Sequence, residues 1–147
     1  MKKVTAILCV LIIMTTLLVA FVGCDPKDGK LKPEISFPSS WPENEITANV
    51  PELKYGEISY ATNFVGADRF YLQIKDITIE DSLKYVEELK ADGFVVTNYE
   101  EDDNFKDYDL RNESRKCNVY VNIPKGNDSD GNPRNQLGLT ITTIREK

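Results

Sequence analysis

The sequence predicts an α+β domain, an antiparallel sheet of four to five strands with one amphipathic helix on one face. Several segments alternate apolar and polar residues with the two-residue period of strands. One segment has helical spacing together with signals for both helix ends. The connections between the alternating segments are short, which favours antiparallel pairing. We therefore expect the order β-β-α-β-β-β within a 147-residue chain, a length that suits one domain.

Five segments carry the strand pattern. Residues 70–75 alternate Phe70, Leu72 and Ile74 with polar or aromatic neighbours, and residues 117–123 repeat this with Cys117 and three β-branched residues. Residues 57–62, 94–97 and 137–142 give the other three strands. A turn containing Gly66 should join the strands at 57–62 and 70–75. The polar run that starts at Glu100 should interrupt the strand that begins at residue 94.

The helix is predicted over the residues between Thr78 and Gly93. Thr78 can cap the first turn, where Glu80 and Asp81 suit the positive end of the helix dipole. Asp92-Gly93 supplies the glycine that commonly ends a helix. The apolar positions expected to face the sheet are Ile79, Leu83, Val86 and Leu89.

The N-terminus has the layout of an export signal. Lys2 and Lys3 precede the uncharged stretch 4–21, and small residues follow it before Cys24. With Val22 and Gly23 before that cysteine, the segment resembles a bacterial lipoprotein signal peptide with its lipobox. Phe21 departs from the pattern, where leucine is usual.

The resemblance implies cleavage after Gly23 and lipidation of Cys24 with a diacylglyceryl group. Two acyl chains give stable anchoring, where a single chain is marginal. The alternatives are an uncleaved membrane-spanning anchor, for which eighteen apolar residues are just long enough, and a coincidental cytosolic start. In either membrane-bound case, the domain lies on the outer face of the cytoplasmic membrane, in a bacterial cell envelope.

The chain then divides into three parts. Residues 1–23 are the expected lipoprotein signal peptide, 24–49 a proline-rich extended tether and lead-in, and 50–147 a single small α+β domain. Proline restricts both itself and the preceding residue to extended conformations, which makes the tether a semi-rigid spacer. The more apolar lead-in, with Trp41, Ile46 and Val50, should fold back and cap the domain. Its Trp41 is either a packing anchor or an exposed platform for a ligand.

Composition argues against several classes of function. The chain has no histidine, the commonest general base and metal ligand. Its net charge of −6 argues against nucleic acid as a partner, because that function needs a basic face. After signal cleavage and lipidation, Cys117 would be the one remaining thiol, so no internal disulfide can form. We predict no catalytic residues, no cofactor and no metal site.

Three features resemble functional sites but have simpler interpretations. The carboxylates at 100–109 form either a solvated loop or, with less support, a cation site, because their spacing matches no ligand loop. Residues 128–132 resemble part of a Ca²⁺ loop but lack its first ligand and its bidentate glutamate, which favours a turn. Cys117 suits the core better than an intermolecular disulfide or a catalytic thiol, because no histidine can activate it.

A candidate binding face lies opposite the helix. If the helix covers Leu72, Val119 and Leu139, the other side of the sheet carries amide and hydroxyl groups beside two tyrosines. Such side chains form adaptable hydrogen bonds and stack against rings, although threonine and tyrosine are also common in ordinary strands. The residues of this candidate face are Tyr71, Gln73, Asn118, Tyr120, Asn122, Thr140 and Thr142.

A second resemblance involves residues 41–99. The Trp41-Pro42 segment and a helix that ends in a Gly93-Phe94 step resemble small clostridial and other Gram-positive lipoproteins of unknown function, which carry a short β-β-α-β domain. The expected function is a non-catalytic binding module for a cell-wall glycan or a peptide, held at the membrane by Cys24. The alternative is an inhibitor or assembly subunit of an envelope protein complex.

Overall fold

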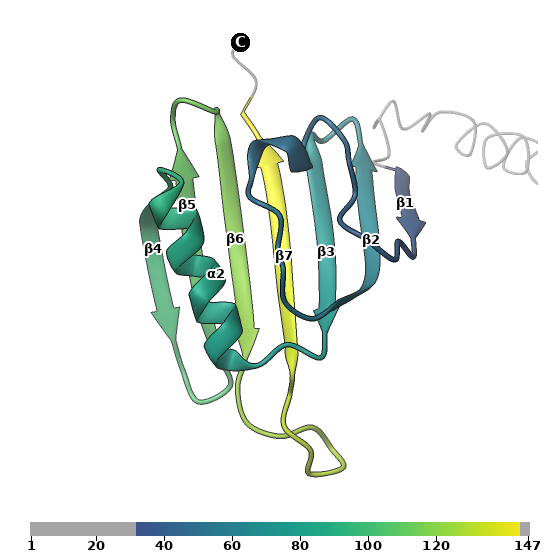
Figure 1. The fold of residues 1–147 in the computed structure, drawn as a ribbon, viewed down its shortest axis with the longest axis vertical. Coiled ribbons are helices and arrows are strands. Elements are labelled where there is room, and N and C mark those ends of the chain that lie inside the picture. Colours follow the sequence, from purple (N-terminus) through teal and green to yellow (C-terminus); the bar gives the residue numbers. More distant parts are fainter. Residues whose placement is uncertain (1–31, 145–147) are drawn as a thin grey trace, which may run out of the picture. The chain divides into compact units, whose positions relative to one another are not determined.

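The computed structural model describes residues 32–144, and its strands form one antiparallel sheet (Figure 1). The expected signal peptide and Cys24 lie outside the described residues, as does the tether before residue 32. The strand order across the sheet is β1-β2-β3-β7-β6-β5-β4. The strands are β1 (Lys32–Ser36), β2 (Glu57–Val65), β3 (Arg69–Lys75), β4 (Val95–Glu101), β5 (Phe105–Asn112), β6 (Cys117–Pro124) and β7 (Gln136–Thr143).

The predicted fold class is wrong, because the sheet has seven strands and the described part of the chain is mainly β. The order along the chain is β-β-β-α-β-β-β-β instead of β-β-α-β-β-β. Two strands were not expected. β1 lies in the segment interpreted as a tether, and β5 includes residues of the acidic run interpreted as a loop.

The helix α2 (Ile79–Ala91) begins and ends where the sequence predicts. The Thr78 side chain accepts a hydrogen bond from the Asp81 amide, and Gly93 follows the helix with a φ of 91°. The buried stripe differs in detail, because Ile79 is 37% exposed and Tyr85, which is outside the predicted stripe, is fully buried. The Tyr85 hydroxyl donates to the carbonyl of Pro51 at 2.9 Å, which satisfies its polar end in the core.

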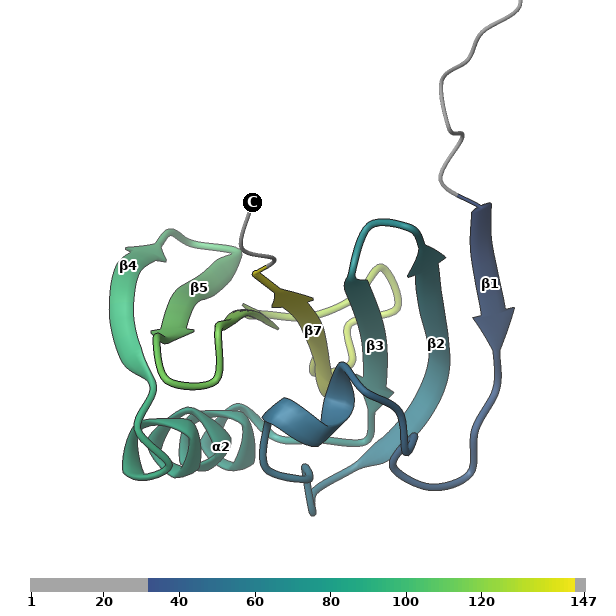
Figure 2. The same ribbon diagram turned by 90° about the horizontal axis from the view of Figure 1, so that it is seen from above.

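Two elements cover the same face of the sheet (Figure 2). α2 lies on one part of it, and the segment 37–56 with the short 3-10 helix η1 (Thr47–Asn49) lies on the other. Val50 is buried in the core, and Trp41, Ile46 and Leu53 pack against it. The second layer is therefore completed by the segment before β2, which explains how one helix suffices for a wide sheet.

β4 and β5 form a hairpin from the acidic run, and two lysines neutralise one of its carboxylates. Glu101 lies opposite Lys106 in the strand register and forms ion pairs with Lys106 and Lys125 at 3.1 and 2.9 Å. At the tip, the Asp102 side chain accepts from the amides of Asn104 and Phe105 and closes the turn. In β5, Leu110 is buried opposite Val119 of β6.

Candidate functional site

The seven residues of the candidate binding face lie on one side of the sheet, opposite α2. The strand register places Tyr71 of β3 beside Thr140 of β7, which lies beside Tyr120 of β6. Their sequence neighbours Leu72, Leu139 and Val119 are fully or almost fully buried on the other side. We call this uncovered side the open face.

Cross-strand pairing arranges the open face in three rows. The first row contains Arg69, Thr142, Asn118 and Arg111. The second contains Thr62, Tyr71, Thr140, Tyr120 and Asp109, and the third contains Tyr60, Gln73, Gly138, Asn122, Asp107 and Glu100. The register therefore brings together all seven predicted residues and adds charged ones that the prediction did not include.

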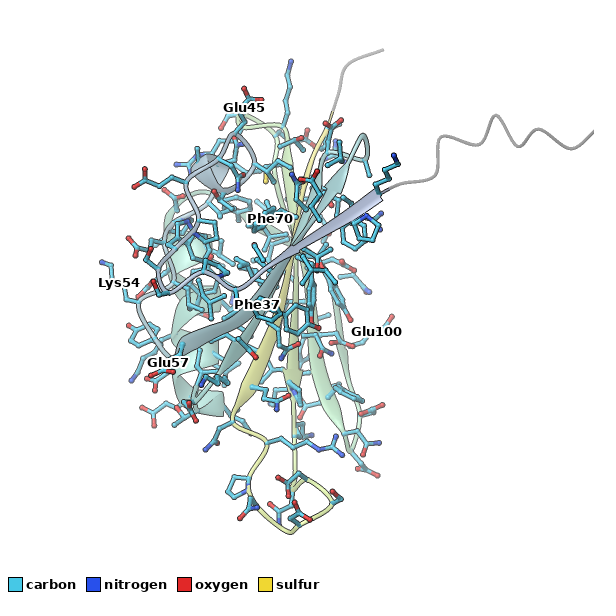
Figure 3. The ribbon with its side chains drawn as sticks, turned by 90° about the vertical axis from the view of Figure 1, so that its right-hand side faces the viewer. Phe37, Glu45, Lys54, Glu57, Phe70 and Glu100 are labelled. Atoms are coloured by element: carbon cyan, nitrogen blue, oxygen red, sulfur yellow. The ribbon has the colours of Figure 1, made fainter. Side chains whose placement is uncertain are left out.

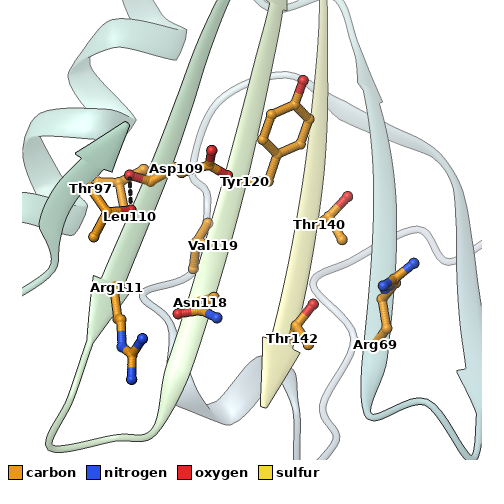
Figure 4. A pocket seen from close by; sticks show the side chains of 10 residues that line it. All are labelled: Arg69, Thr97, Asp109, Leu110, Arg111, Asn118, Val119, Tyr120, Thr140 and Thr142. Atoms are coloured by element: carbon orange, nitrogen blue, oxygen red, sulfur yellow. Dashed lines mark hydrogen bonds between the residues drawn. The ribbon is translucent and has the colours of Figure 1, made fainter. Parts of the chain in front are cut away.

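A hollow of about 550 Å³ lies over the first two rows (Figure 4). Four of the seven predicted residues line it, namely Asn118, Tyr120, Thr140 and Thr142. Arg69, Asp109 and Arg111 also line it, as does Thr97, whose hydroxyl donates to the Asp109 carbonyl at 3.2 Å. The volume lies within the range of small-ligand sites, and the lining combines polar with apolar groups.

The other three predicted residues are engaged with neighbours beside the hollow. The rings of Tyr71 and Tyr60 lie 5.8 Å apart, and the Tyr71 hydroxyl donates to the Gln73 side chain. Burial raises the pKa of Tyr71 to about 12, so its hydroxyl stays protonated and can donate at neutral pH. Asn122 donates to the Asp107 carboxylate at 2.6 Å.

Tyr120 is the most accessible aromatic side chain of the hollow. It is 37% exposed, and partial burial followed by hydrogen bonding to Asp107 raises its pKa. A protonated phenol offers a ring edge and face together with a hydroxyl that donates and accepts. Tyr120 can therefore contact both the apolar and the polar parts of a ligand.

Sequence reasoning missed the charged residues of the open face. Asp107, Asp109 and Arg111 belong to β5, which was interpreted as a loop, so no side of the sheet could be assigned to them. Arg69 begins β3, and its alternation with Tyr71 and Gln73 was available as a signal. The open face therefore carries neutral side chains on β6 and β7 and charged ones on β3 and β5.

The features given simpler interpretations lie elsewhere in the structure. Among residues 32–144, no group of His, Cys, Asp and Glu side chains is arranged to hold a metal ion. The Asp128 carboxylate accepts from the amides of Asp130 and Asn132, both at 2.9 Å, in a turn. Cys117 is buried, and this burial raises the pKa of its thiol to about 11. Trp41 packs against the core, which favours the anchor interpretation.

Comparisons with protein-family models, with curated proteins and with solved structures find no significant similarity to this chain. In the described part of the chain, no helix has the length and apolar character needed to cross a bilayer. The two resemblances noted in the sequence therefore stay predictions, and the open face is the site from which a function can be argued.

Proposed function

We propose that this protein is an extracytoplasmic lipoprotein whose open face binds a glycan or an extended peptide without catalysing a reaction. The observation that carries the proposal is the hollow over the first two rows, where hydroxyl and amide groups surround one accessible tyrosine ring. The lipid on Cys24 would hold this face in the cell envelope, next to wall polymers and other extracytoplasmic ligands.

A glycan suits this lining because sugars need donors and acceptors at short intervals. Thr140, Thr142 and Tyr120 each offer a hydroxyl that can act in either sense, and Asn118 offers both functions in one amide. The apolar face of a sugar ring can stack on an aromatic side chain such as Tyr120. An extended peptide offers similar alternating groups, which is why it stays within the proposal.

The test is retention of the purified domain on insoluble cell-wall material. We expect Tyr120→Ala to reduce retention about tenfold or more, because a central aromatic contact commonly carries much of the binding energy. The matched control is Tyr99→Ala. Tyr99 is 45% exposed and lies on β4 opposite Tyr108, whose side chain packs toward the core. Retention of this variant should equal that of the unsubstituted domain.

Tyr71→Ala is a less selective variant, because Tyr71 packs on Tyr60 and hydrogen-bonds to Gln73. Its melting temperature must be measured beside its retention, and Tyr71→Phe separates loss of the hydroxyl from loss of the ring. Unchanged retention for Tyr120→Ala, with Tyr99→Ala also unchanged, would exclude the open face as the binding site.

One observation favours the second candidate, an inhibitor or assembly subunit of an envelope complex. Every residue of the edge strand β1 is exposed. Ile35 within this strand is 62% exposed, and Phe37 just after it is 78% exposed. An uncovered edge strand can pair with a strand of another protein. Pull-down from detergent extracts distinguishes the two candidates. If a stoichiometric partner is lost with Ile35→Asp but kept with Tyr120→Ala, the protein binds that partner through the edge strand β1.

A further inference from the structure

The first row of the open face is a line of hydrogen-bond donors across four neighbouring strands. In the register of the strands, Arg69 pairs with Thr142, Thr142 with Asn118, and Asn118 with Arg111. Figure 4 shows the two arginines on either side of Asn118 and Thr142. Each of the four side chains can donate, and only the hydroxyl and the amide can also accept.

The two arginines differ in how their charge is compensated. The guanidinium of Arg111 forms two contacts with Glu113, at 2.7 and 3.1 Å, so much of its charge is neutralised locally. No described residue forms an ion pair or hydrogen bond with the guanidinium of Arg69, which is exposed at the β3 end of the row. Arg69 is therefore the cation of the hollow that an incoming anion can pair with.

Acidic groups occupy a different part of the hollow. Asp109 lies in the second row on β5, three strands from Arg69, and Asp107 in the third row already accepts from Asn122. Strands lie about 4.8 Å apart, so about 14 Å of sheet separates β3, which carries Arg69, from β5, which carries Asp109. At this distance, the repulsion between Asp109 and an anion at Arg69 is largely screened at physiological ionic strength.

We propose that the first row binds an anionic group, a phosphate or a carboxylate, carried by the glycan or polymer that occupies the open face. This inference rests on the proposed function and specifies its ligand class. Arginine pairs with both anions in a fork-shaped geometry, and Thr142 and Asn118 can donate to further oxygens. The net charge of −6 disfavours general attraction of polyanions, so binding of one would have to come from this local row.

The test compares three oligomers of similar length by titration calorimetry with the purified domain. They are a neutral chitooligosaccharide, a galacturonic acid oligomer that carries carboxylates, and a glycerol phosphate oligomer. We expect at least one anionic oligomer to bind more tightly than the neutral one, with affinity that falls as salt increases. The anionic oligomer that binds more tightly identifies the preferred anion as phosphate or carboxylate.

Arg69→Gln should weaken the binding of that oligomer about tenfold, because it removes a charge-assisted hydrogen bond. The exposed position of Arg69 makes a loss of folding unexpected, which the melting temperature checks. Lys54→Gln is the charge-matched control. Figure 3 shows Lys54 and Glu100 on opposite sides of the molecule, and Glu100 belongs to the open face, so Lys54→Gln should leave the affinity unchanged.

Two results would overturn the inference and leave the proposed function intact. One is an Arg69→Gln affinity equal to that of the unsubstituted domain while Tyr120→Ala still weakens binding. The other is that both anionic oligomers bind no more tightly than the neutral one, or do not bind at all, while wall retention still depends on Tyr120. If neither variant alters binding or wall retention, the inference and the proposed function both fail.

Discussion

Gly56 precedes β2 at a point where the structure leaves no room for a side chain. Its φ is 71°, and a Cβ there would lie 2.6 Å from the Lys75 carbonyl oxygen and 2.7 Å from the Ile74 Cγ2 atom. Gly131 has a similar φ of 84°, but nothing lies within 4 Å of its would-be Cβ. The two glycines thus share a left-handed backbone and differ in their surroundings.

Alanine substitutions at these glycines should separate backbone strain from steric clash. We expect Gly131→Ala to lower the free energy of unfolding by about 1 kcal/mol, the usual cost of a left-handed alanine. Gly56→Ala should cost about 3 kcal/mol, because backbone and core atoms must also move. Urea denaturation of both variants measures the difference. Equal losses would show that the contacts around Gly56 relax freely.

At the residue scale, sequence alternation identified the neutral residues of the candidate site but not the charged residues beside them. Tyr71 and Gln73 alternate with the buried Leu72 and Ile74, so their side of the strand could be read directly. Asp109 and Arg111 also alternate with Tyr108 and Leu110, but two such positions among charges are too weak a pattern to identify a strand. Their place on the open face depends on pairing with β6.

The β4–β5 hairpin is the element whose stability depends most clearly on charge. Hydrogen bonds from Lys125 and then from Tyr99 and Lys106 lower the pKa of Glu101 to about 2, below its usual value of 4.5. A carboxyl whose pKa is lowered by folding stabilises the folded state above its unfolded pKa. That contribution disappears as pH falls from about 4.5 to about 2, where the folded carboxyl also becomes protonated.

Glu101→Gln should therefore reduce stability at pH 7 and make less difference as the solution is acidified toward pH 2. Urea unfolding at several pH values between 7 and 2 measures this convergence. Glu100→Gln is the matched control, because Glu100 lies next in the strand and accepts only from Asn98, at 3.2 Å, among the described residues. A constant gap between Glu101→Gln and the unsubstituted domain would contradict the assigned ion pairs.

Elements with strong local signals were predicted well, and those that depend on partners were not. α2 has its cap at Thr78 and its terminating Gly93 within its own sequence. β1 contains Pro33, which is unusual within sheets, and it becomes a strand only by pairing with β2 at the edge. β5 likewise depends on its two neighbours, because its apolar alternation is limited to Tyr108 and Leu110.

At the scale of the whole molecule, the proposal depends on the lipid predicted at Cys24. Expression of the full chain in a bacterium with the lipoprotein pathway should place it in the detergent phase of a phase-separation assay. We expect Cys24→Ala to abolish lipidation and the cleavage that follows it, leaving a larger precursor. Mass spectrometry of the N-terminal peptide checks both outcomes.

A suitable control for that experiment is Cys117→Ala, because Cys117 is buried in the folded domain and should carry no lipid. This variant should be cleaved and anchored like the unsubstituted chain. If the unsubstituted chain is recovered from the cytosolic fraction with an unmodified Met1 at its N-terminus, the extracytoplasmic assignment is rejected. The open face would then have to be tested against cytosolic ligands.

The sequence by itself determined the helix and the five strands with an apolar period. For three of these strands it also determined which side carries the candidate residues. These features depend on neighbours within a few positions along the chain, which a pattern can express. Only the tertiary structure decided that β1 and β5 widen the sheet. It also decided that Arg69 and Arg111 share a row with Thr142 and Asn118, because cross-strand register arises between segments far apart in the sequence.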